Sequence, residues 1–290
     1  MATIRQVRAR MKAATNIQQI TKAMKMVAAA RLKRAQERVM TARPFAGIMR
    51  EMMTSLASGA GQSVEHPLLA VRPPRNVGFL IITADRGLCG SFNSGLLRRA
   101  VAMLRAYDKE HVRLYVVGRK GIQFFKRRGY NVASEFHITN LGVSYSDAQE
   151  LTRIMRTDFE TEVIDQLFLL FTHFVTAMTQ RPTDAQLLPI QQPEGDGKED
   201  QAAPEDYIFE PNAQRLMQSL LPRYLEFQVF QALLESTASE HGARMTSMSS
   251  ATDNAGKMIT SLTLQLNRAR QAGITREISE IVGGAEALKG

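Results

Sequence analysis

The segment TNIQQITKAMKMVAAARLKRAQERV, residues 15–39, contains six Lys or Arg residues, one acidic residue and neither Gly nor Pro. This composition favours a long helix with a basic surface. Pro44 follows it, but we expect a kink there rather than an end. The reason is a heptad seam, which predicts that residues 1–57 form one arm of a coiled coil. Small or apolar side chains recur at alternating steps of four and three and keep their phase across Pro44, at Ala28, Leu32, Ala35, Val39, Ala42, Ala46, Met49, Met53 and Leu56.

A second seam lies near the other end of the chain. The phase shifts after it, to Ile274, Ile278 and Ile281. This pattern predicts a C-terminal helix over residues 212–286. Because the two seams belong to opposite ends of the chain, we expect the helices to pair antiparallel as a long coiled coil. The second seam consists of Leu234, Ala238, His241, Met245, Met248, Thr252, Ala255, Ile259, Leu262, Leu266, Ala269 and Gly273.

Between these helices the hydrophobic pattern becomes that of an α/β domain. Strands that alternate with helices indicate a largely parallel sheet, here over residues 76–190. Residues 191–211 are rich in acids and breakers, which is typical of a loop and junction. The predicted strands are residues 76–83, 113–118, 131–136, 166–175 and 184–190, and the predicted helices are residues 91–110, 121–129 and 146–160.

The basic charge is concentrated at the N-terminus. Residues 1–50 hold twelve Lys or Arg and one acid, a net charge of +11, although the whole chain carries only +9. A basic helix could bind nucleic acid, an anionic membrane or an acidic protein surface. Its apolar stripe is rich in Ala and lacks bulky aromatic anchors, which counts against the membrane. No apolar run approaches the ~18 residues needed to span a bilayer, so we expect no direct membrane insertion.

No motif for catalysis or cofactor binding stands out. The segment ITADRGLCGSFN, residues 82–93, joins a predicted strand to a predicted helix but lacks the Gly and Lys spacing of a phosphate-binding loop. Cys89 is the sole cysteine, and the five histidines form no close ligand pair. We therefore expect no catalytic residue, cofactor or metal. A nucleotide-using enzyme built on the α/β domain is a rival hypothesis, which ATP turnover by the chain alone would favour.

Five segments give the sequence a specific resemblance. With them the chain resembles the γ subunit of F-type ATP synthase, the central rotor shaft, over essentially its whole length. The resemblance implies an antiparallel coiled coil with an inserted Rossmann-like α/β domain. It also implies a non-catalytic subunit that couples rotation of a proton-driven membrane ring to conformational cycling of the β-subunit catalytic sites. The segments are ITKAMKMVAAARLKRAQ (20–36), ITADRGLCGSFN (82–93), RPTDAQLLP (181–189), MTSMSSATDNAG (245–256) and LNRARQAGITREISEIVGGAEAL (266–288).

The resemblance also implies partners. The far end of the coil would stand inside the ring of α and β subunits, and the globular end would lie on the membrane rotor ring of c subunits, beside the ε subunit. Tyr207 and Glu210, in DYIFEP, match the segment near the membrane ring. We expect a peripheral position on the cytoplasmic face of a bacterial cell membrane. The main alternative is a nucleic-acid-binding module that uses the basic N-terminal helix, which a steeply salt-dependent affinity for duplex DNA would support.

The matching motifs imply contact residues for the β subunits as well. Lys22, Met24 and Lys25 match basic-helix positions that meet acidic loops of the β subunits. We expect them to face Arg270 and Gln271 on the other helix, which the resemblance implies as contact residues for the β subunits too. Exposed contacts of this kind contribute about 0–1 kcal/mol each, which is weak enough to be exchanged at every rotary step.

Overall fold

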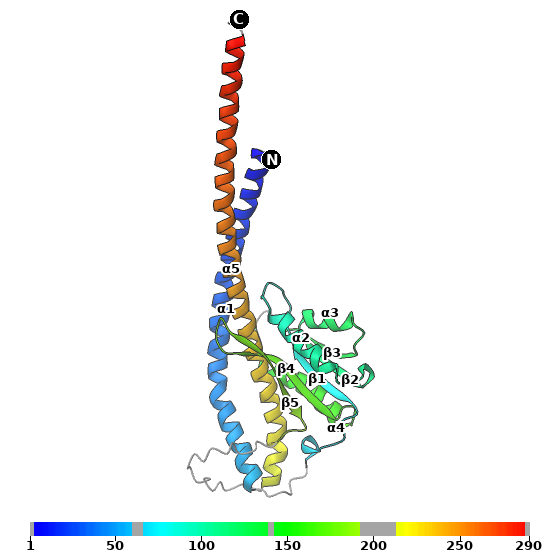
Figure 1. Cartoon of the computed structure of the whole chain (residues 1–290). Helices are drawn as coiled ribbons and strands as arrows, with labels where there is room; N and C mark the ends of the chain where they lie inside the picture. Colours follow the sequence, from blue (N-terminus) through cyan, green and yellow to red (C-terminus); the bar gives the residue numbers. More distant parts are fainter. Residues whose placement is uncertain (1–2, 60–65, 139–141, 192–212, 288–290) are drawn as a thin grey trace. The chain divides into compact units, whose positions relative to one another are not determined.

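The computed structural model describes residues 3–59, 66–138, 142–191 and 213–287. The chain forms two compact units. The coil unit comprises residues 1–28 and 245–290, and the sheet unit comprises residues 29–244. Two long helices run through both units, α1 (Ile4–Gly59) and α5 (Ala213–Ala287), as Figure 1 shows. The predicted fold class, an α/β domain inserted between long N- and C-terminal helices, is confirmed.

Both long helices continue through a proline. Pro44 lies inside α1 and Pro222 inside α5. The prediction that α1 does not end at Pro44 is therefore confirmed. Pro44 is exposed, while Met49 and Met53 beyond it return to the buried seam. Burial of this seam offsets the backbone hydrogen bond that a proline removes. None of the described helices is both long and apolar enough to cross a bilayer.

The sheet unit is built on a five-stranded sheet in the order β3-β2-β1-β4-β5. The first four strands in the chain pair in parallel, and β5 runs antiparallel to β4 at the edge. Every residue of β1 is buried, as expected for a central strand covered on both faces. The strands are β1 (Val77–Ile82), β2 (Val112–Val117), β3 (Val132–Phe136), β4 (Gln166–Phe174) and β5 (Gln180–Leu188).

The predicted strands and helices are all present, and the largest differences lie at the start of one strand and the end of one helix. Strand β5 begins at Gln180 rather than at residue 184, and it includes Pro182. Proline is tolerated there because β5 is an edge strand. Helix α2 (Phe92–Leu104) ends six residues before the predicted position 110. The chain must turn after it so that the Tyr107 ring can pack edge-on against Phe79, at 5.7 Å between ring centroids.

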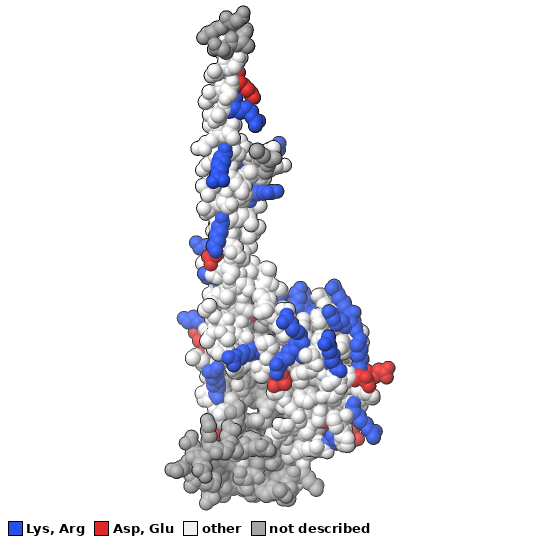
Figure 2. Space-filling model, viewed as in Figure 1, with Lys and Arg blue, Asp and Glu red and all other residues white. Residues whose placement is uncertain are grey.

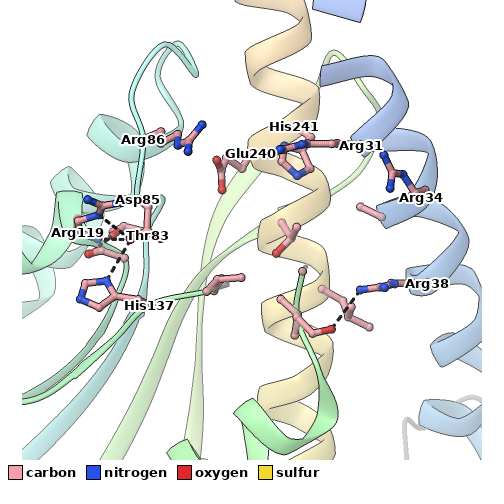
Figure 3. Close-up of a pocket in the computed structure, with 17 residues that line it drawn as sticks. Arg31, Arg34, Arg38, Thr83, Asp85, Arg86, Arg119, His137, Glu240 and His241 are labelled. Atoms are coloured by element: carbon pink, nitrogen blue, oxygen red, sulfur yellow. Dashed lines mark hydrogen bonds and ion pairs between the residues drawn. The ribbon is translucent and has the colours of Figure 1, made fainter. Parts of the chain in front are cut away.

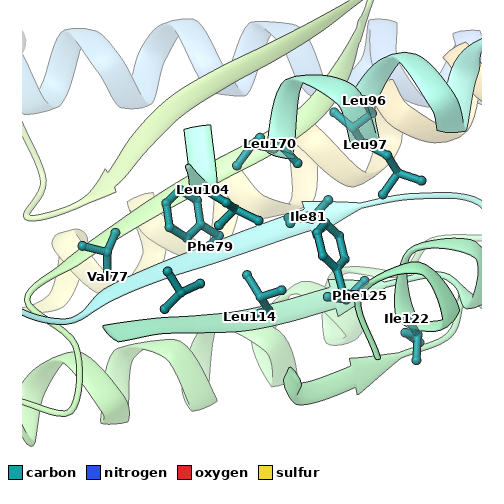
Figure 4. Packing of buried hydrophobic residues seen from close by; sticks show 13 residues of the cluster. Val77, Phe79, Ile81, Leu96, Leu97, Leu104, Leu114, Ile122, Phe125 and Leu170 are labelled. Carbon is teal, nitrogen blue, oxygen red and sulfur yellow. The ribbon is translucent and has the colours of Figure 1, made fainter. Parts of the chain in front are cut away.

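Three shorter helices cover the sheet, namely α2, α3 (Arg119–Lys126) and α4 (Tyr145–Glu160). Figure 4 shows the core beneath α2, where Leu96, Leu97 and Leu104 pack on Phe79 and Ile81 of β1. Full burial of each such side chain stabilises the fold by ~1.5–3 kcal/mol. Helix α4 begins with a capping box between Ser144 and Asp147, which satisfies two backbone donors that the helix itself leaves unpaired.

Within the sheet unit α5 is joined to the sheet by hydrogen bonds. The Thr172 amide of β4 donates to Ser236 Oγ at 3.2 Å, and Ser239 Oγ donates to the Thr172 carbonyl at 3.0 Å. Both serines are buried. A buried backbone group without a partner costs free energy, so these bonds specify where α5 crosses β4.

Candidate functional site: the surface of the coil unit

The two helices of the coil unit pair antiparallel. Each step forward along α1 is matched by a similar step back along α5. At one end of the pair, Val7, Ala14 and Leu262 form a buried cluster. Three contacts between polar or sulfur atoms set the register, and they join Lys25 Nζ to Ser249 Oγ at 3.0 Å, Thr21 Oγ1 to Thr252 Oγ1 at 2.9 Å, and Thr263 Oγ1 to Met11 Sδ at 3.7 Å.

This register shows that one expected opposition is wrong. Lys22, Met24 and Lys25 do not face Arg270 and Gln271. Lys25 lies opposite Ser249, and Arg270 is farther along α5 by roughly 30 Å at 1.5 Å per residue. The reason is that the seam of α1 extends back from Ala28 to Val7. The N-terminal turns of α1, which precede Lys22, therefore pack on the part of α5 that lies between Ser249 and Arg270.

The proposed contact residues differ in their surroundings. Lys22, Arg270 and Gln271 are exposed, and Met24 is half-buried. Lys25 is exposed as well, but its ammonium donates to Ser249. Tyr207 and Glu210, the residues expected at the membrane ring, lie outside the described part of the chain. The structure therefore leaves two cations and one amide on this surface open to a partner.

Helix α1 carries a second apolar stripe that the sequence reasoning missed. Ile17, Ile20 and Val27 are 53%, 59% and 55% exposed, and Met24 lies between them at the same helical spacing. Steps of three and four place these four residues on one face. The signal was present in the sequence, because Ile17 and Ile20 fall out of phase with the seam through Ala14 and Thr21. We call Ile17, Ile20, Met24 and Val27 the outer stripe.

The C-terminal turns of α5 expose a further apolar face. Ile274, Ile278, Ile281 and Val282 are 49%, 55%, 71% and 59% exposed. No described residue of the coil unit covers them. A single helix gains most of its stability from packing an apolar face against another element. The exposed apolar face of this part of α5 therefore indicates a contact with a partner protein. We call these four residues the α5 tip.

The α1 part of the coil unit is purely basic. Residues 1–28 contain six Lys or Arg and no acid. Figure 2 shows Lys and Arg side chains along the coil, with few Asp or Glu beside them. A surface with exposed apolar stripes and unpaired positive charge suits a protein partner whose contact surface is acidic at its rim.

Among the described residues, no arrangement of side chains is typical of a catalytic or metal-binding site. No group of three or more His, Cys, Asp or Glu side chains in them is placed to hold a metal ion. Cys89 is buried, and burial raises the pKa of its thiol, which disfavours the reactive thiolate. The Cys89 Sγ accepts a hydrogen bond from Asn93 Nδ2 at 3.3 Å, while Asn93 Oδ1 accepts from the Ala84 amide. These groups hold the loop after β1 in shape.

Comparison with known proteins points to one family. The sequence model of the ATP synthase family matches residues 3–288. The chain is 48% identical to the ATP synthase gamma chain of Desulfitobacterium hafniense and 46% identical to that of Pelotomaculum thermopropionicum, with 100% of each chain covered in both cases. Neither relative is described as a nucleic-acid-binding protein.

Solved structures resemble the fold as well. The central stalk of the Tetrahymena thermophila mitochondrial ATP synthase matches with a TM-score of 0.60 and 25% identity, covering 80% of this chain and 99% of that one. A chain of the Euglena gracilis mitochondrial ATP synthase matches with a TM-score of 0.68 and 19% identity, covering 98% and 94%. The likeness to the second structure concerns the fold alone.

Proposed function

The chain belongs to the ATP synthase gamma-chain family, and we propose that its coil unit is the part that transmits rotation to the catalytic β subunits. The chain is a non-catalytic central-stalk subunit of an F-type ATP synthase. Its role is mechanical, and the ATP sites belong to other subunits.

One observation carries the proposal. The coil unit exposes two sets of large apolar side chains. They are the outer stripe, in which only Met24 is half-buried, and the α5 tip. Exposed apolar area of this extent marks a protein interface. Because the outer stripe and the tip lie on different stretches of the coil, a partner that covers both must extend along it. A ring of alternating α and β subunits is such a partner.

The charged residues of the coil unit would make weak contacts with the β subunits, which can be exchanged as the chain rotates. Lys22 and Arg270 are exposed, so ion pairs with acidic loops of the β subunits would contribute about 0–1 kcal/mol each. Met24 supplies an adaptable apolar contact beside them, and Gln271 adds a neutral hydrogen-bonding group. Contacts that differ from one β subunit to the next bias each catalytic site towards a different state, and rotation moves the bias from one site to the next.

A separate segment of the chain is proposed for the membrane ring. We assign Tyr207 and Glu210 to that contact by their match to the family motif, with the ε subunit and the ring of c subunits as neighbours. As part of the membrane-associated ATP synthase, the chain would lie peripherally on the cytoplasmic face of a bacterial cell membrane and couple to proton flow. The domain limits that we propose are residues 1–57, 76–190, 191–211 and 212–286.

Reconstitution tests the proposal directly. Purified α and β subunits are mixed with the full chain, and complex formation and ATP-driven rotation of a bead on the chain are measured. We expect a stable complex that rotates in one direction. A complex that hydrolyses ATP without turning the chain would overturn the mechanical role, and failure to form any complex would overturn the assignment of the coil unit as its contact.

A further inference from the structure

The sheet unit contains a cavity of about 560 Å³. It opens at the carboxyl ends of β1, β2 and β3, where the chain continues into Thr83, Gly118 and His137. Helices α1 and α5 complete its wall. Figure 3 shows α1, α5 and the loops after these strands around it. In open α/β sheets, ligands bind in the crevice outside the carboxyl ends of the strands, and sites for small molecules have volumes of ~300–1,000 Å³.

Three arginine side chains line this cavity with guanidinium groups that are unpaired among the described residues. Arg31 and Arg34 come from α1, and Arg86 comes from the loop after β1. Within the part of the chain that the structure describes, none of the three guanidinium groups makes a hydrogen bond or an ion pair. Arg38, one turn beyond Arg34 on the same face of α1, donates to the Val143 carbonyl at 3.3 Å. Positively charged side chains from both α1 and the loop after β1 thus line the cavity.

Two carboxylates line the cavity against five arginines, and each carboxylate has a cation of its own. Asp85 Oδ1 accepts from the Arg119 amide at 2.9 Å and lies 3.7 Å from Arg119 Nε and 3.2 Å from His137 Nδ1. Glu240 Oε1 lies 2.7 Å from Arg244 Nη1, and burial nevertheless raises the pKa of Glu240. Both acids are therefore already paired with a cation. Arg31 acts on Glu240 through its charge, but among the described residues it makes no ion pair with Glu240.

The positive charge at the cavity wall also acts on His241 of α5, together with burial. Burial, followed by the charges of Arg244, Arg31 and Arg34, lowers the pKa of His241 to about 4. Its ring is neutral at pH 7 and adds no positive charge of its own. An anion in the cavity would relieve the field that Arg31 and Arg34 create there.

We propose that this cavity binds a compact phosphate-bearing anion through Arg31, Arg34 and Arg86. Guanidinium groups match phosphate oxygens with paired hydrogen bonds. The amides at the start of α3 cannot serve instead, because Arg119 N donates to Asp85 and Lys120 N to the Ala84 carbonyl. The concave shape favours a small anion over an acidic peptide. All residues of the site belong to the sheet unit, so its test does not depend on the function proposed for the coil unit.

Calorimetric titration of the full chain tests the site with three probes: inorganic phosphate, pyrophosphate and ADP. We expect saturable binding of one anion per chain, and the order of affinities distinguishes free phosphate chemistry from a nucleotide. The double variant R31Q/R34Q is expected to weaken binding at least about tenfold, because it removes two charge-assisted contacts. R86Q, which alters the opposite wall, is expected to weaken it as well.

The matched control is K33Q/R43Q. It also removes two positive charges, but from exposed positions of α1 that do not line the cavity. We expect it to change affinity less than about twofold, with both double variants melting at the same temperature as the parent. Absence of saturable binding for all three probes would overturn the site. Equal losses in both double variants would show diffuse charge attraction instead. Tighter binding of a glutamate-rich peptide that pyrophosphate does not displace would assign the cavity to a protein partner and overturn the proposal.

Discussion

The Lys25 ammonium donates a 3.0 Å hydrogen bond to Ser249 Oγ across the two helices of the coil unit, whereas Lys22, one turn away, makes no hydrogen bond or ion pair with any described residue. These two lysines therefore form a matched pair for testing the surface. K22Q is expected to slow ATP-driven rotation about two- to fivefold in the reconstituted complex, because it removes an exposed contact worth up to ~1 kcal/mol.

K25Q also removes one positive charge, but the ammonium of Lys25 already donates a hydrogen bond within the chain. We expect a smaller effect on rotation and a loss of stability of about 0.5–1.5 kcal/mol. Rotation rates and urea unfolding of both variants decide the matter. Equal effects of the two substitutions on rotation would contradict the conclusion that Lys22, and not Lys25, is open to a partner.

The outer stripe and the seam should respond in opposite ways to substitution. I20S replaces a side chain that is 59% exposed, so the free energy of unfolding of the chain alone should change by less than about 0.5 kcal/mol, while affinity for the α and β subunits falls. L262A opens the buried seam, where Leu262 is 7% exposed, and should cost about 2–3 kcal/mol of stability. Circular dichroism and complex titration measure the two quantities. A strongly destabilised I20S chain would show that the stripe is covered within the chain itself.

Deletion of residues 274–290 removes the α5 tip without touching the seam before it. We expect affinity for the α and β ring to fall at least about tenfold, since burial of a single isoleucine contributes ~1.5–3 kcal/mol. Torque on a tethered bead should fall with it, while the melting temperature of the shortened chain stays within a few degrees of the parent, about 2–4 °C at most. Unchanged torque in the deletion would argue against the tip as a contact.

His241 should make the sheet unit sensitive to acid. Its pKa is lowered from 6.5 to about 4, so an unfolded chain takes up a proton as the pH falls through 6.5 while the folded chain does not. Stability is therefore fully present above pH 6.5 and is lost towards pH 4, by at most ~3 kcal/mol from this group. H241Q should lose about 1–3 kcal/mol less than the parent between pH 7 and pH 4.5 in urea titrations. The same loss in both chains would rule out His241 as the cause.

Two glycines offer a paired test of the loop after β2. Gly118 has a φ of +93°, and a Cβ there would meet the Thr83 carbonyl oxygen at 2.2 Å. Gly129 has a φ of +71°, but nothing lies within 4 Å of its Cβ position. G129A should cost ~1–2 kcal/mol for the left-handed backbone alone. G118A adds a steric clash with backbone and should cost at least about 3 kcal/mol, measured by thermal unfolding. Equal costs would show that the loop moves freely away from Thr83.

The secondary structure could be predicted because its signals are local. The heptad steps from Ala28 onward, the continuous apolar run of β1 and the alternation of strands with helices each depend on neighbours a few residues away. The ends of elements were harder. Pro182 argues against a strand on local grounds, and only its place in an edge strand, beside Thr172 of β4, makes it acceptable.

What the sequence by itself determined is that two long helices pair and that an α/β domain lies between them. It did not determine the register. A heptad pattern repeats every seven residues, so several alignments of the two seams satisfy it, and only side-chain fit selects the one that joins Lys25 to Ser249 instead of placing it near Arg270. The cavity that brings Arg31, Arg86 and His241 together likewise appears only in three dimensions, because residues so far apart in the chain become neighbours through packing, not through any local pattern.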